Sequence, residues 1–207
     1  MLLTSKARFN VASWGRQSGK TTAGLQKLFT VPLKGKADSV YWYILQNHSA
    51  ADVAFKRFVN MYPRNTQSLL FEKRPNETDK TVFIKGNVQI CFKSGSEYDN
   101  LRIETLNGVI IDECREQPHQ LWTQVIRPML AKHKGWADFY STPNGYDWFY
   151  DLAMFSQDHK DRGGREWSYI HAPSSESPWW TKEELESARS SMTETGYRQE
   201  ILAEVVE

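Results

Sequence analysis

Short apolar runs alternate with polar stretches of helical spacing along most of the chain. The runs Val40–Leu45 (VYWYIL) and Gly108–Ile111 (GVII) are continuously apolar, which is typical of strands that a parallel sheet buries on both faces. Strands are expected over 9–13, 40–45, 108–111, 136–140 and 167–172, β-rich runs over 68–73, 81–86 and 88–94, and helices over 20–29, 50–62 and 119–130, with two more from about Thr181 and Thr195. Strands that alternate with helices predict an α/β fold with a mostly parallel sheet.

Local signals refine some of these elements. Gly86-Asn87 separates two β-rich runs and predicts a hairpin turn, and Ser49 is a candidate cap for the helix that ends before Pro63. After about residue 150 the pattern becomes more polar and more helical. We therefore expect a core over residues 1–150 and a small helical lid or linker over 151–207.

Composition narrows the class of protein. The chain has 207 residues with 26 Lys and Arg against 25 Asp and Glu, so it does not hold nucleic acid by net charge alone. Cys91 and Cys114 are too few for a disulfide framework, and no apolar run reaches the roughly 18 residues of a membrane span. A globular protein of a reducing cytoplasm is expected.

The segment Trp14–Thr21 (WGRQSGKT) lies between the first predicted strand and the first predicted helix. It approximates the phosphate loop of nucleotide-binding proteins, although Trp14 holds the first glycine position and Gly15 follows it. In such a loop backbone N–H groups surround phosphate oxygens, Lys20 reaches the β- and γ-phosphates, and the Thr21 hydroxyl binds Mg²⁺. The expected ligands are ATP and Mg²⁺.

Asp112 and Glu113 follow the buried run GVII directly. Open α/β sheets bind ligands at the carboxyl ends of their strands, so both carboxylates are expected at the nucleotide. Asp112 would hold Mg²⁺, and Glu113 would deprotonate the attacking water. This pair favours hydrolysis over phosphoryl transfer by a kinase.

Several segments together resemble the ATPase domain of the large terminase subunit, the DNA-packaging motor of tailed double-stranded DNA bacteriophages. The resemblance rests on GRQSGKTT (15–22), VYWYILQNHSAADVAF (40–55), DNLR (99–102), GVIIDE (108–113), LWTQVIRPML (121–130), GWADFYSTPNGYDWFYDL (135–152) and GYRQEILAEVV (196–206). It implies a P-loop NTPase fold of the RecA-like type. It also implies that the nuclease domain of that family lies outside this chain.

The resemblance assigns further roles. Arg16 resembles the phosphate-loop arginine, Arg102 an arginine finger that enters a neighbouring subunit, and Ser141 with Thr142 the coupling motif. The nucleotide-binding residues expected in this way are Gly15, Arg16, Gln17, Ser18, Gly19, Lys20, Thr21 and Thr22.

The implied partners are double-stranded DNA, a portal protein, a small terminase subunit and further copies of the chain in a ring. The implied location is the host cytoplasm, at the procapsid portal. Two alternatives remain open at this stage, a helicase-like DNA-dependent ATPase and a nucleotide-binding module without turnover. A helicase would need a second RecA-like domain, of which the sequence has no sign.

Overall fold

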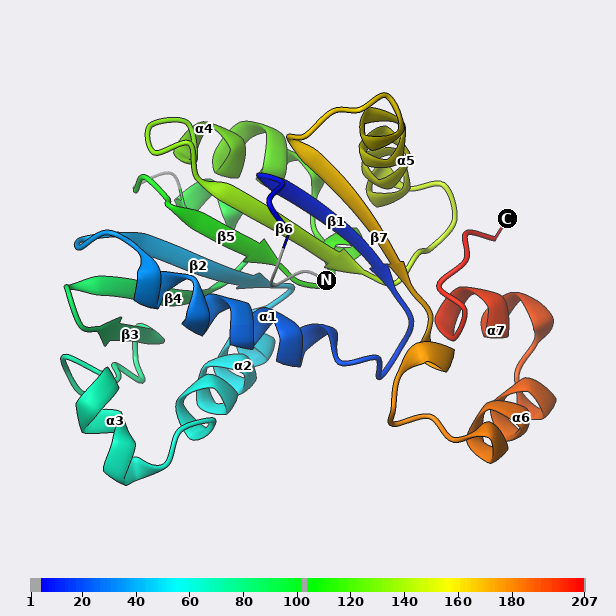
Figure 1. Cartoon of the computed structure of the whole chain (residues 1–207), viewed down its shortest axis with the longest axis horizontal. Helices are drawn as coiled ribbons and strands as arrows, with labels where there is room; N and C mark the ends of the chain where they lie inside the picture. The colour runs from blue at the N-terminus through cyan, green and yellow to red at the C-terminus, as the bar shows by residue number, and fades with distance from the viewer. Residues whose placement is uncertain (1–4, 102–103, 207) are drawn as a thin grey trace. The chain divides into compact units, whose positions relative to one another are not determined.

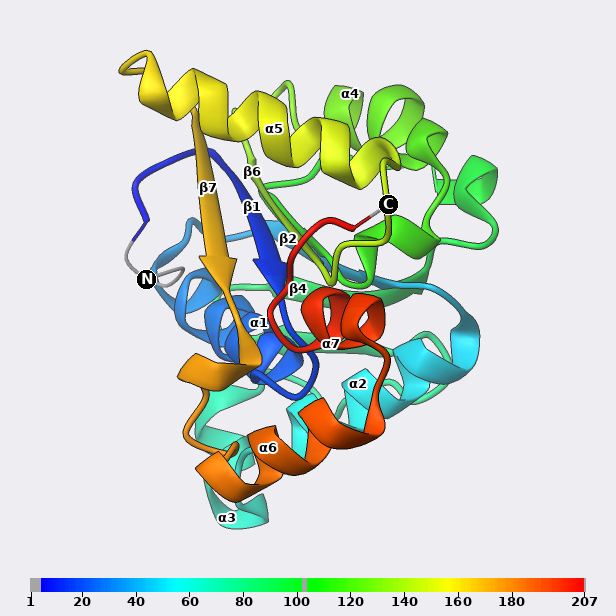
Figure 2. The ribbon, with the colours of Figure 1, turned by 90° about the vertical axis from the view of Figure 1, so that its right-hand side faces the viewer.

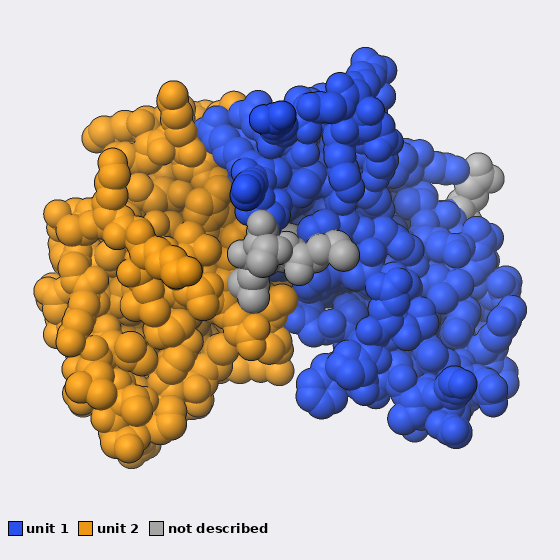
Figure 3. Space-filling model, viewed as in Figure 1, with its two compact units in different colours: residues 1–20, 113–115, 138–207 blue, residues 21–112, 116–137 orange. Residues whose placement is uncertain are grey.

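A computed structural model describes residues 5–101 and 104–206 of the chain. Contacts divide it into two compact units, which Figure 3 colours separately. Unit 1 comprises residues 1–20, 113–115 and 138–207, and unit 2 comprises residues 21–112 and 116–137. The predicted division near residue 150 stays a prediction.

The strands confirm the predicted α/β class. Within the described residues, seven strands are ordered β3-β4-β2-β5-β6-β1-β7 (Figure 1). Their bounds are β1 Phe9–Trp14, β2 Val40–Leu45, β3 Thr81–Ile84, β4 Val88–Ser94, β5 Gly108–Ile111, β6 Trp136–Ser141 and β7 Trp167–Ala172. The pairs β1–β7, β2–β4 and β2–β5 are parallel, and β3–β4 is antiparallel, so the sheet is mostly parallel as expected.

Unit 2 is built around β2, which lies between β4 and β5. Its α-helices are α1 Lys20–Thr30 (whose first residue belongs to unit 1), α2 His48–Asn60, α3 Arg64–Leu70 and α4 Arg127–Met129. Other helical segments are the 3₁₀ turns Pro32–Lys34 and Tyr98–Leu101 and the π-helix Leu121–Ile126. Phe55 and Phe58 of α2 pack their rings against Phe92 of β4. This aromatic contact anchors α2 on β4.

Unit 1 places β7 beside β1 in parallel, with Phe9 opposite Trp167 and Trp14 opposite Ala172. Helix α5 (Trp148–Asp161) lies across the start of β7 in Figure 2. Two further helices follow β7, α6 (Lys182–Ser191) and α7 (Glu194–Glu200), and both begin at a threonine whose side chain caps the first turn. Short helical turns lie at Cys114–Glu116 and Ser174–Glu176.

The structure tests three of the local predictions, a β-rich run, a helix cap and a hairpin turn. The β-rich run expected over 68–73 is wrong at Ser68–Leu70, which end helix α3, whose Gln67 amide donates to the carbonyls of Val59 and Tyr62. Phe71 does form an antiparallel bridge with Ile84 of β3. The cap of α2 is Asn47, whose side chain accepts from the Ala50 N–H, and not Ser49. The hairpin at Gly86-Asn87 is confirmed, with φ of 88° and 55° at the two residues.

The helix predicted over 119–130 is present in a modified form. Its central part, Leu121–Ile126, is a π-helix, and the α-helical turn Arg127–Met129 follows it. Pro128 has no N–H to donate into the preceding turn, which accounts for the irregular hydrogen bonding. No helix in the described residues has the length and apolar character that crossing a membrane requires.

Candidate active site

The predicted phosphate-binding loop follows β1. It spans residues 15–19 between the end of β1 at Trp14 and the first residue of α1, Lys20. Gln17 and Gly19 have φ of 53° and 90°, in the left-handed region that Gly19 occupies without steric cost. In an anion nest, left- and right-handed residues alternate and successive N–H groups turn toward one point, and two left-handed residues two positions apart are compatible with that arrangement. The Ser18 hydroxyl donates to the Gly15 carbonyl at 2.6 Å and closes the loop.

Lys20 is buried, and its ammonium group has two partners in unit 1. Nζ lies 3.1 Å from Oε1 of Glu113 and donates to Oγ1 of Thr142 at 2.9 Å. The Thr142 hydroxyl in turn donates to the carbonyl of Trp14 at 2.9 Å. The structure therefore brings together three residues that were predicted from separate segments of the sequence.

Asp112 and Thr21 meet in unit 2. The Thr21 hydroxyl donates to Oδ2 of Asp112 at 3.1 Å, and the Tyr43 hydroxyl donates to the same oxygen at 2.7 Å. Asp112 is only 3% exposed. Tyr43 was not predicted as a site residue, because its place in the apolar run VYWYIL gives no sign of a polar contact.

Glu113 has an unusual backbone. Its φ is 46°, in the left-handed region, and its side chain remains 41% exposed. Non-glycine residues with positive φ are uncommon and collect at functional sites. The backbone thus turns directly after the buried Asp112, and the second carboxylate keeps access to water.

The predicted coupling residues lie at the end of β6 and are buried. The Ser141 hydroxyl accepts from the N–H of Arg115 at 3.2 Å. The Arg115 guanidinium donates to the carbonyls of Thr142 and Pro143, at 3.2 and 3.1 Å. Arg115 therefore ties the turn after Glu113 to the predicted coupling motif, a role that nothing in the sequence pattern indicates.

Arg16 is exposed and forms an ion pair with Glu200 of α7, in the same unit. Thr22 lies on the exposed side of α1. Arg102, the predicted finger, lies outside the described residues, so its role stays a prediction. The nucleotide-binding roles expected for the other loop residues likewise stay predictions.

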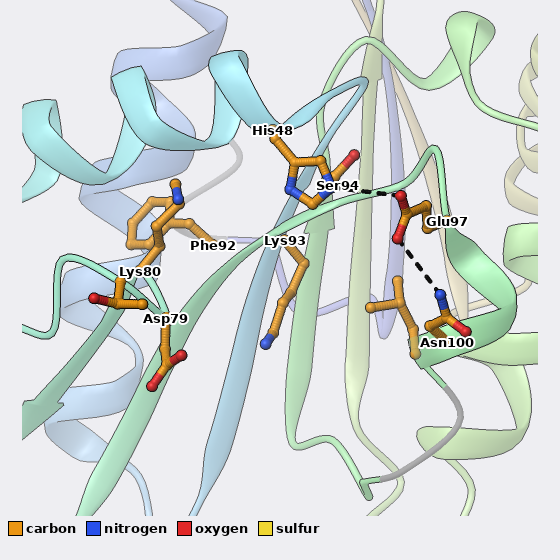
Figure 4. Close-up of a pocket in the computed structure, with 10 residues that line it drawn as sticks. His48, Asp79, Lys80, Phe92, Lys93, Ser94, Glu97 and Asn100 are labelled. Carbon is orange, nitrogen blue, oxygen red and sulfur yellow. Dashed lines mark hydrogen bonds and ion pairs between the residues drawn. The ribbon is translucent and has the colours of Figure 1, made fainter.

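Unit 2 also contains a pocket of about 240 Å³, which the candidate site residues described above do not line (Figure 4). It is lined by residues that include His48, Lys80 and Lys93. Its charges are mixed, since Glu97 lies 4.0 Å from the His48 ring nitrogen and also accepts from Asn100. Neither the phosphate loop nor the acidic pair lines it, so it is not the nucleotide site proposed below.

Comparison with known proteins identifies the family. The profile of the N-terminal part of the terminase large subunit, T4-like virus type, matches residues 11–203. The chain belongs to the terminase large subunit family. The expected family and fold are therefore confirmed.

Individual terminases agree with this assignment. The terminase large subunit of Thermus phage G20c is 33% identical over 166 residues, which are 72% of this chain and 34% of the relative. The chain thus spans about a third of the length of that curated relative. The large terminase ATPase domain of Thermus phage P74-26 superposes with a TM-score of 0.81 at 26% identity, over 98% of this chain and 90% of that one.

A more distant terminase shares the fold. The large terminase of a thermophilic bacteriophage, solved in complex with ADP, gives a TM-score of 0.79 at 16% identity. The match covers 97% of this chain and 48% of that terminase.

Proposed function

We propose that this chain is the ATPase motor domain of a phage terminase, which hydrolyses ATP to move double-stranded DNA into a procapsid. The observation that carries the proposal is the cluster in unit 1, where Lys20 of the phosphate loop lies 3.1 Å from the carboxylate of Glu113. Lys20 would bind the β- and γ-phosphates, and Glu113 would accept a proton from the attacking water. The ATPase domain of P74-26 terminase, which covers nearly all of this chain in superposition, supports the same activity.

Thr21 and Asp112 fit a Mg²⁺ site. One hydroxyl and one buried carboxylate are already in contact, and Mg²⁺ commonly takes one or two such oxygens together with waters and phosphate oxygens. Among the described residues no group of three or more His, Cys, Asp and Glu side chains could hold a metal ion by itself. When bound, Mg²⁺ would neutralise charge that develops on the phosphate oxygens.

The partners follow from the family rather than from a surface of this chain. We propose that copies assemble as a ring at the portal in the host cytoplasm, with a small terminase subunit and DNA. Arg102 would then serve as the finger that stabilises charge in the neighbouring site, an effect of about 10³- to 10⁵-fold in other systems. The predicted roles of Arg16, Ser141 and Thr142 belong to the same proposal.

The experiment compares wild type with Glu113→Gln in steady-state ATP hydrolysis with Mg²⁺, together with equilibrium binding of a fluorescent ATP analogue. Glu113→Gln is expected to bind nucleotide and to lose turnover by about 100-fold or more, because general-base catalysis contributes about 10²- to 10⁴-fold. Glu77→Gln, which changes an exposed carboxylate in unit 2, is the matched control and is expected to behave as wild type.

Protein concentration separates the assembly proposal from the hydrolysis proposal. Specific activity that rises with concentration supports a residue supplied by a neighbouring copy, and Arg102→Ala is expected to remove that rise. If wild type and Glu113→Gln both bind nucleotide and have the same turnover, Glu113 is not the base. Binding without hydrolysis at any concentration would favour the nucleotide-binding module instead.

A further inference from the structure

The phosphate loop forms hydrogen bonds with a segment far along the chain, from the end of β7 to the end of α7. The Gly15 N–H donates to the carbonyl of Ala172 at 3.0 Å, and the Arg16 N–H donates to the carbonyl of Glu200 at 2.7 Å. All four residues belong to unit 1. Figure 2 shows α7 beside the end of β1, in agreement with these bonds. The N–H groups of Gly15 and Arg16 therefore bond to this segment, which leaves the N–H groups further along the loop for a ligand.

Ser174 is the centre of this arrangement. It is fully buried, and its hydroxyl donates to the carbonyl of Arg16 at 2.6 Å. Its own N–H donates to the carbonyl of Ile201 at 2.7 Å, so one residue links the loop to the end of α7. The indole N–H of Trp180 also reaches the Arg16 carbonyl, at a longer 3.3 Å.

Gly15 shows how closely the two segments approach. A Cβ placed on Gly15 would lie 2.3 Å from the Ser174 hydroxyl oxygen and 2.6 Å from the Ile201 carbonyl oxygen. Both are shorter than any contact that a real Cβ makes, and the second involves backbone that cannot rotate away. Ser174 and Ile201 therefore leave no space for a side chain at Gly15, whether or not a phosphate binds to the loop.

We infer that Ser174 is a positioning residue for nucleotide binding, which fixes the direction of the Arg16 carbonyl and with it the peptide planes of the phosphate loop. The inference rests on the proposed function, since it assumes that the loop binds nucleotide phosphates. An anion nest binds well only when its N–H groups already point to one site, because ordering them on binding costs conformational entropy. Ser174 supplies that order from outside the loop.

This arrangement has a reciprocal consequence. If the docked segment around Ser174 favours nucleotide binding, then bound nucleotide must favour the docked segment by the same free energy. The amides of Ser174 and Arg16 should therefore exchange with solvent more slowly when nucleotide is bound. Such a link gives the C-terminal helices a direct response to the occupancy of the nucleotide site.

The test is the affinity of Ser174→Ala for a fluorescent ATP analogue, measured by equilibrium titration. We expect the Kd to rise by about 5- to 20-fold, because the Arg16 carbonyl loses its best donor while Lys20 and Thr21 are unchanged. The matched control is Ser156→Ala, which removes another fully buried serine hydroxyl of unit 1, one that donates to the Leu152 carbonyl inside α5. Its Kd is expected to stay within about twofold of wild type.

A conservative variant and hydrogen exchange guard against a purely structural effect. Ser174→Cys keeps the size of the side chain and a weak donor, and should recover part of the affinity. In wild type, the analogue should slow exchange of the Arg16 and Ser174 amides by about fivefold or more relative to amides of α5.

Equal Kd values for Ser174→Ala and Ser156→Ala would overturn the inference, as would unchanged exchange at both amides in a wild-type protein that binds the analogue. The two proposals fail in different ways. If wild type does not bind the analogue at all, the proposed nucleotide-binding function is wrong; if wild type binds and the variants bind equally, only the role of Ser174 is wrong.

Discussion

Replacement of Thr142 by valine tests the buried cluster around Lys20 most directly. Valine has nearly the shape of threonine, so the change removes the hydroxyl and little else. Thr142 is 2% exposed, and the hydroxyl makes two bonds: it accepts from the Lys20 ammonium and donates to the Trp14 carbonyl, both at 2.9 Å. A neutral hydrogen bond contributes about 0.5 to 1.5 kcal/mol and one to a charged group about 1.5 to 3 kcal/mol. Lys20 keeps its contact with Glu113, so we expect a loss of about 2 to 4 kcal/mol in the free energy of unfolding.

Urea unfolding measures this loss, and Thr142→Ser is the control. Serine keeps the hydroxyl and removes one methyl group, so it should cost about 1 kcal/mol, close to the value for one buried methylene. Turnover of ATP should fall by about tenfold or more in Thr142→Val, since Lys20 then depends on Glu113 alone, and each 1.4 kcal/mol of lost transition-state stabilisation is about tenfold in rate. If Thr142→Val has a free energy of unfolding within about 0.5 kcal/mol of wild type, the hydroxyl does not hold Lys20 in place.

Two further predictions concern other parts of unit 1. Gly15→Ala should destabilise the protein by about 1 to 3 kcal/mol in urea unfolding, the usual cost of overpacking, because a Cβ has no space beside Ser174; a variant as stable as wild type would contradict that packing. Asp147 caps α5, and partial burial raises the pKa of its carboxyl above the ordinary 3.8, despite the favourable bond from the Tyr150 N–H. The folded state therefore binds the proton more tightly than the unfolded state, so this group costs stability above the raised pKa and the cost disappears below about pH 3.8. Asp147→Asn, which keeps a capping side chain, should be more stable than wild type at about pH 7. Urea unfolding of both proteins at several pH values should show that this difference in stability shrinks toward about pH 3.5. A difference that does not depend on pH would exclude the raised pKa of Asp147 as its cause.

Local sequence signals were sufficient for much of the fold. The apolar run GVII marked a buried parallel strand, Gly86-Asn87 marked a hairpin, and the glycines and Lys20 marked the loop that joins β1 to α1. Each of these depends on residues close together in the chain. The error at Ser68–Leu70 has the opposite origin, since two consecutive leucines suggest a strand, whereas Gln67 holds the turn as helix and leaves Leu69 exposed.

The missed residues of the candidate site depend on contacts across the fold. Ser174 and Arg16 are 158 positions apart, and Arg16 and Glu200 are 184 apart. Arg115 follows the acidic pair closely, yet its partners are carbonyl groups of a turn that starts 27 residues later. Serine, arginine and glutamate are common surface residues, so composition and periodicity give no reason to select these three. Only the tertiary structure reveals what they touch.

The two consecutive carboxylates Asp112 and Glu113 illustrate how the fold gives similar groups different chemistry. Asp112 lies at the end of a buried strand, where the hydroxyls of Tyr43 and Thr21 donate to one of its oxygens. Carboxylate oxygens are ligands that Mg²⁺ takes, in agreement with the role proposed for Asp112. The left-handed turn at Glu113 brings the next carboxylate to the Lys20 ammonium while 41% of its side chain stays exposed. A general base must reach the water whose proton it accepts. The left-handed backbone at Glu113 therefore gives the two carboxylates different surroundings, because an extended residue at that position would continue the strand and direct the carboxylate to the other face of the sheet.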